Sequence, residues 1–146
     1  MKDIEKLERK VSSWPKVSVH PHRLGGREFR FGAAEIGHVH AGGILDIPFT
    51  RSIRDALLSE GLAEEHPWLP NSGWVTFRIR TPKELSRAVW LLRLSYLRYA
   101  LKNANNPHGM FEAESEQLQL SSRFKTLLKV FIPRFSKQVP AEPVSA

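Results

Sequence analysis

The sequence predicts an α+β fold: an antiparallel sheet of about four to five strands covered by helices, with a further helix near the C-terminus. Residues 16–20, 27–31 and 73–80 alternate apolar and polar side chains, which is typical of strands. Residues 35–49 contain a glycine turn between two strand-like runs, which favours a hairpin. Residues 82–103 carry apolar side chains at helical spacing on a wide face, which predicts the main helix that covers the sheet.

Length and composition fit a basic protein with an ordinary hydrophobic core. The chain has 146 residues, of which 41% are hydrophobic and 25% charged, and its net charge is +7. It has no cysteine, so disulfides, cysteine-based zinc sites and a thiol nucleophile are excluded. No run approaches the ~18 apolar residues of a membrane span, and the charged N-terminal segment is no secretory signal, so we expect a cytoplasmic protein.

The order of the elements predicts the domain organisation. A short amphipathic helix over residues 2–13 is followed by the first strand, which the His20-Pro21-His22 segment should interrupt. Later in the chain, Thr50 is an N-cap for a helix over residues 51–60. Thr81 and Glu84 form a capping box for the long helix.

We expect three segments in the chain. Residues 1–107 form a single α+β domain that includes the N-terminal helix. Residues 108–135 form a linker followed by an amphipathic basic helix. Residues 136–146 form a disordered tail, since they are polar and rich in proline.

The hairpin contains the best candidate site. His38 and His40 share one face of a strand because side chains alternate. A two-residue turn would place Asp46 on the opposite face, whereas a three-residue turn at residues 41–43 places Asp46 opposite His38. We prefer the longer turn, because it separates the polar residues from Val39 and its apolar neighbours. Gly37 then lies on the core face, where it would let a helix approach closely.

Two kinds of chemistry are open to these residues. His38, His40 and Asp46, with His66 from a nearby loop, could ligate a metal ion. Alternatively, the histidines line a groove and hydrogen-bond Asp46, which would support proton transfer. Two histidines without a fixed distal motif favour the second interpretation, so we expect no metal and no cofactor.

Other polar and aromatic residues complete the candidate site. Trp74, with Trp68, could line a small-molecule pocket. Ser72 lacks the surroundings of a serine nucleophile and fits a turn that opens the next strand, so it is a candidate for ligand binding alone. Arg51 and the strand arginines are cations that could bind phosphate or nucleic acid, or form a solvated face.

Short blocks of the sequence resemble a small luciferase-like domain family of bacterial and fungal proteins, distinct from the flavin-dependent barrel and insect luciferases. The blocks run from His38 through Asp46, from Gly61 to His66, from Ser72 to Val75, and over residues 91–96. The resemblance covers about residues 16–100 and implies an α+β domain. The positions that match the family's motif are His38, His40, Asp46, His66, Ser72 and Trp74.

We therefore expect a luciferase-like domain protein that binds or transforms a small molecule at a groove lined by His, Asp and Trp. His38, His40 and Asp46 are the candidate catalytic residues. The candidate ligand-binding residues are His66, Ser72, Trp74 and Arg51. The alternative is a nucleic-acid or protein interaction module that uses the basic sheet residues and the basic C-terminal segment.

Overall fold

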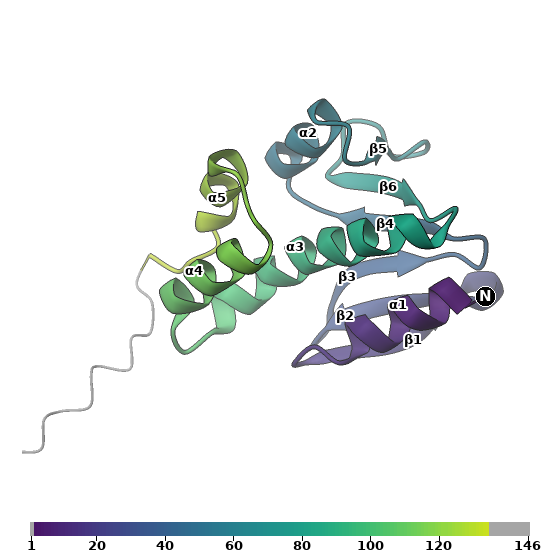
Figure 1. Ribbon diagram of the computed structural model, residues 1–146, viewed down its shortest axis with the longest axis horizontal. Coiled ribbons are helices and arrows are strands. Elements are labelled where there is room, and N and C mark those ends of the chain that lie inside the picture. Colours follow the sequence, from purple (N-terminus) through teal and green to yellow (C-terminus); the bar gives the residue numbers. More distant parts are fainter. Residues whose placement is uncertain (1, 135–146) are drawn as a thin grey trace, which may run out of the picture. The chain divides into compact units, whose positions relative to one another are not determined.

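The computed structural model describes residues 2–134. The chain divides into two compact units after Tyr96, within helix α3 (Leu85–Asn103). The first unit contains the whole sheet (Figure 1). The predicted domain boundary near residue 107 remains a prediction, and the predicted tail, residues 136–146, lies outside the described residues.

The predicted α+β class is confirmed, with one sheet of six antiparallel strands in the order β1-β2-β3-β4-β6-β5. The sequence does not predict the sixth strand, β5, because it has only two residues, too few to show alternation. The strands are β1 (Val17–His22), β2 (Gly26–Phe31), β3 (Ala34–Val39), β4 (Ile44–Pro48), β5 (Glu64–Glu65) and β6 (Trp74–Arg78).

The helix α2 begins where the sequence predicts, whereas the long helix predicted from residue 82 becomes an α-helix only at Leu85. Thr50 caps α2 (Arg51–Ser59) by accepting a hydrogen bond from the Ile53 backbone N–H. A short 3-10 turn, η2 (Pro82–Glu84), leads into α3, and the Thr81 side chain caps it by accepting from the Lys83 N–H. The predicted capping box is not formed as such, because the Thr81 hydroxyl donates to the Glu84 carboxylate, which also accepts from the Arg80 N–H. The other elements are α1 (Lys2–Ser12) and a 3-10 turn, η1 (Arg23–Gly25).

One face of the sheet packs against α1 and the first part of α3, which cross it in Figure 1. Val39, Leu45 and Ile47 are fully buried on this face, as the hairpin pattern predicts. A side chain at Gly37 would place its Cβ 2.6 Å from Leu92 Cδ2, so glycine is what lets α3 approach. The core therefore lies on the face opposite His38 and His40.

Two strand features differ from the sequence prediction. Pro21 does not interrupt β1, which continues to His22, because β1 is an edge strand and loses no ladder hydrogen bond to a proline. In addition, the register between β2 and β3 shifts at Phe29/Arg30, which marks a β-bulge. The register skips Ile36, the extra residue of the bulge, which is fully buried, whereas strict alternation would place it beside His38.

The second unit contains two further helices. The predicted linker is helical: α4 (Pro107–Gln117) begins at the N-cap Asn106, whose side chain accepts from the Gly109 N–H. Asn106-Pro107 is thus a helix start as well as a break after α3. The predicted basic helix is shorter than expected, α5 (Ser122–Lys129), and is capped by Ser121. Within residues 2–134, no helix is both long and apolar enough to cross a membrane.

Candidate functional site

A row of polar side chains crosses the sheet on the face opposite the core. The register aligns one residue from each strand, and His38 lies directly opposite Asp46. The three-residue turn is confirmed, since the His40 N–H donates to the Ile44 carbonyl. From edge to edge the row is His20, Glu28, His38, Asp46, Thr76 and Glu64.

Asp46 lies at the centre of this row and is only 5% exposed. Its Oδ1 accepts a 2.7 Å hydrogen bond from the Thr76 hydroxyl. Its Oδ2 lies 2.9 Å from His40 Nε2 and 3.3 Å from His38 Nε2. Burial alone would raise the pKa of Asp46, but its hydrogen bonds with His38, Thr76 and His40 hold that pKa well below its usual range. Asp46 is therefore a buried carboxylate surrounded by donors.

His38 lies between two carboxylates. Its Nδ1 is 2.6 Å from Glu35 Oε2, and its Nε2 faces Asp46. Burial lowers the pKa of His38, but hydrogen bonding and charge from Asp46 and Glu35 outweigh burial and raise that pKa to about 9. Glu35 reaches this position because of the β-bulge; in a regular strand, residues three apart would face opposite sides.

His66 reaches the same carboxylate from the loop before β6, with its Nε2 3.7 Å from Asp46 Oδ2. Its Nδ1 accepts a hydrogen bond from the Trp68 backbone N–H at 3.2 Å. Since Nδ1 is an acceptor, the neutral imidazole carries its proton on Nε2, the nitrogen that faces Asp46. The loop therefore brings His66 to the same face as His38 and His40, which the sequence left open.

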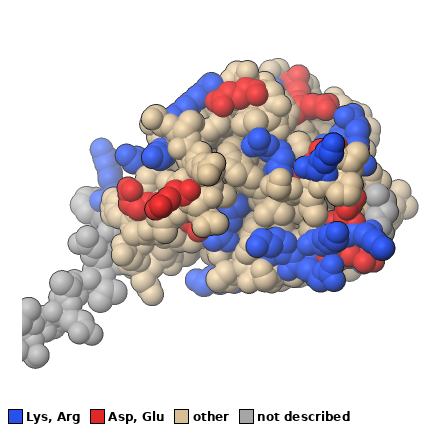
Figure 2. All heavy atoms as spheres, viewed as in Figure 1, with Lys and Arg blue, Asp and Glu red and all other residues tan. Residues whose placement is uncertain are grey.

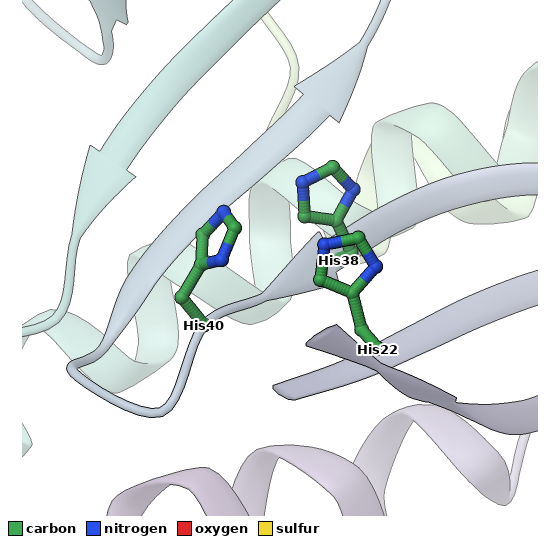
Figure 3. A group of neighbouring side chains, drawn as sticks. All are labelled: His22, His38 and His40. Atoms are coloured by element: carbon green, nitrogen blue, oxygen red, sulfur yellow. The ribbon is translucent and has the colours of Figure 1, made fainter. Parts of the chain in front are cut away.

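His22 is part of this cluster and was absent from the sequence prediction. Its ring stacks on His38, with centroids 4.1 Å apart and planes 18° apart, and lies 5.2 Å from the His40 ring (Figure 3). Burial and the positive charges of His38 and His40 lower the pKa of His22. The signal that could have found it is its spacing of two from His20, which places both on one face if the strand continues through Pro21.

These side chains line a groove in the first unit. Three cavities of about 320, 430 and 280 Å³ share His40 and Trp68 in their linings. Trp74 lines one of them, and its ring centroid is 5.6 Å from that of His38. The groove therefore brings together His38, His40, Asp46, His66 and Trp74.

Two predicted site residues lie apart from the groove lining. Arg51 is the exposed first residue of α2. Ser72 is occupied in a turn: its hydroxyl donates to the Leu69 carbonyl at 2.6 Å and accepts from the Trp74 N–H at 3.1 Å. A ligand-binding role for either residue stays a prediction.

Comparison with known proteins agrees with the resemblance noted in the sequence. Residues 33–95 match the family model described as Luciferase domain. This stretch contains His38, His40, Asp46, His66 and Trp74, whereas His22 lies before it. The similarity to a luciferase-like domain family is thus confirmed over these residues. No match was found among curated proteins or among solved structures.

Proposed function

We propose that this luciferase-like domain binds a small organic molecule in the groove, with an aromatic or apolar body at the rim and a polar end directed at the histidines. The observation that carries the proposal is a buried carboxylate, Asp46, placed beside His38, His40 and His66 in a groove that also contains Trp68. Cavities of a few hundred Å³ with a few convergent polar groups are typical of small-molecule sites.

The rim of the groove supports an apolar ligand body. Trp68 is 86% exposed and Leu24 is 96% exposed, and both line the same cavity. Leu24 also has a backbone φ of 54°, in the left-handed region that bulky residues rarely adopt. Exposed large apolar side chains and local backbone strain are both more frequent at functional sites than elsewhere.

The polar end supports proton transfer as the chemistry of the site. His40 shares a 2.9 Å contact with Asp46 through Nε2, and its side chain is 37% exposed. If Nε2–H donates to Asp46, Nδ1 carries the lone pair that can accept a proton or a hydrogen bond from a ligand. In this proposal His40 exchanges the proton, Asp46 orients it, and His38 provides positive charge nearby.

The nucleic-acid alternative is less well supported. The sheet arginines that could bind phosphate have acidic neighbours: Arg27 with Glu8 at 3.5 Å, Arg30 with Glu28 at 2.5 Å, and Arg78 with Glu64 at 3.9 Å. On the side in view in Figure 2, where α1 and α3 lie in front of the sheet, Lys and Arg are likewise interspersed with Asp and Glu. A nucleic-acid interface more often presents an uninterrupted basic stripe.

The four tryptophans provide an internal control for testing small-molecule binding. Each indole N–H gives a separate signal in a ¹H–¹⁵N spectrum recorded during titration with a panel of aromatic fragments. We expect fragments to shift the Trp68 and Trp74 signals and leave Trp14 and Trp90 unchanged, because Trp68 and Trp74 line the groove. Trp68→Ala should weaken binding at least tenfold. Equal shifts of all four signals, or none, would contradict the proposal.

A further inference from the structure

We infer that His22, His38 and His40 form a binding site for a divalent first-row transition metal ion, with Zn²⁺ as the natural probe. One nitrogen of each imidazole lies within 4.8 Å of the others, and Figure 3 shows the three rings grouped beside one another. His22 ends β1, His38 lies in β3, and His40 directly follows β3. Three imidazoles from a rigid sheet are a ligand set that such ions favour.

Each of the three imidazoles also has a carboxylate on its other side. Glu35 Oε2 is 2.6 Å from Nδ1 of His38, and Asp46 Oδ2 is 2.9 Å from Nε2 of His40. Glu28 Oε1 lies 3.7 Å from Nδ1 of His22. Metal-bound histidines usually donate their second N–H to a carboxylate, which fixes the ring orientation. In His38 the nitrogen opposite Glu35 is Nε2, which lies 3.3 Å from Asp46 Oδ2, so binding the ion replaces that contact.

A buried nitrogen without a partner provides an independent observation. Nε2 of His22 is buried and has no hydrogen-bond partner among the described residues. Buried polar atoms are seldom left unsatisfied, and an exception calls for an unplaced water or ion. His22 pairs with Gly26 in the sheet, and its ring centroid is 5.2 Å from that of His40. A metal ion would satisfy this nitrogen.

The charges around the cluster fit a divalent cation. With neutral imidazoles, the carboxylates of Glu35 and Asp46 provide two negative charges at the site, whereas Glu28 is paired with Arg30. Arg23 also lines this groove. His66 is not expected to ligate the ion, because its Nε2 carries a proton and its Nδ1 accepts from Trp68. With His38 and His40 alone, a metal-free groove is the favoured interpretation. The third imidazole, from His22, completes a three-ligand set and favours a metal site.

The cluster needs a small adjustment to bind the ion. Tetrahedral zinc with Zn–N bonds of ~2.0–2.1 Å requires nitrogens ~3.3 Å apart, closer than the upper limit of 4.8 Å. His40 is the ligand able to move, since it is partly exposed and lies beside the glycine turn. Three protein ligands leave a position that can open toward the groove. The ion takes the His40 lone pair that the proposed proton transfer uses, so the metal site stands independently of the small-molecule proposal and replaces proton exchange at that atom.

The test is metal titration of protein purified without a histidine tag and stripped with a chelator. We expect Co²⁺ to produce visible absorption bands at one ion per chain, and Zn²⁺ to displace it. His22→Gln should weaken Co²⁺ binding at least 100-fold, and Glu35→Gln by about 10- to 100-fold. The matched control is His20→Gln, on the same strand and face, whose Nε2 already has a 2.8 Å contact with the Ser18 hydroxyl; it should bind as wild type does.

Circular dichroism establishes that each variant is folded before its affinity is compared. Should Glu35→Gln not fold, the His22→Gln and His20→Gln pair still decides the outcome, since both lie on an edge strand. Absence of stoichiometric binding by the wild type would overturn the inference, as would equal losses in both histidine variants. Fragment shifts at Trp68 in a protein that binds no metal would overturn the metal site and leave the small-molecule proposal standing.

Discussion

The two faces of the sheet are formed by the same alternating strands but are held together by different kinds of interaction. The core face is fixed by many apolar contacts, with Val39, Leu45 and Ile47 fully buried. The opposite face is built on the polar row centred on His38 and Asp46, and each of its contacts depends on one strand register. The core face is stabilised by the burial of many apolar side chains that can replace one another. The histidine face, the face that carries His38 and Asp46, depends on contacts between particular atoms. Substitutions on the two faces should therefore separate stability from binding.

The largest effect is expected from the core face. Leu92→Ala removes a fully buried side chain that packs against Gly37, and should lower the free energy of unfolding by ~2–5 kcal/mol. Urea denaturation followed by circular dichroism measures this. Fragment or metal binding by the protein that remains folded should stay unchanged. A loss below ~1 kcal/mol would mean that α3 is not a main packing partner of the sheet.

A second substitution on the core face tests the close approach of α3. Gly37→Ala places a methyl group 2.6 Å from Leu92 Cδ2, and overpacking of this kind should cost ~1–3 kcal/mol. The Gly37→Ala/Leu92→Ala double variant should be more stable than the sum of the single losses predicts, because the added methyl occupies part of the space left by the leucine. Strict additivity in urea denaturation would show that the two residues do not touch.

A substitution on the histidine face should lower stability less than Leu92→Ala does on the core face. Thr76→Val removes the hydroxyl that donates to Asp46 Oδ1 and leaves a buried acceptor with one partner fewer, at a cost of ~1–3 kcal/mol. The matched control is Thr126→Val in α5, whose exposed hydroxyl donates to the Ser122 carbonyl and should matter by less than ~0.5 kcal/mol. Equal effects in thermal or urea denaturation would mean that Asp46 does not depend on Thr76.

The sequence predicts the core face well because its signals are local. The apolar alternation and the glycine turn of the hairpin place Val39 opposite Leu45 on the core face, and Thr50 places the start of α2. On the histidine face the sequence predicts some of the clustered residues and misses others. His22 is missed because proline normally ends a strand, and only the edge position of β1 allows it to continue. Glu35 is missed because a β-bulge, which only Gly37 within the strand hints at, changes the face to which it points.

The histidine face is built for binding rather than for stability, and His22→Phe tests this most directly. Phenylalanine keeps a ring against His38 and removes the buried nitrogen without a partner. In metal-free urea denaturation we predict a free energy of unfolding equal to that of wild type within ~0.5 kcal/mol, or higher.

The same measurement is then repeated with Zn²⁺. At a concentration 100 times the dissociation constant, zinc should stabilise wild type by ~2.7 kcal/mol and leave His22→Phe unchanged. A variant that loses more than ~1 kcal/mol without metal, together with a wild type that zinc does not stabilise, would contradict the account and assign His22 a structural role.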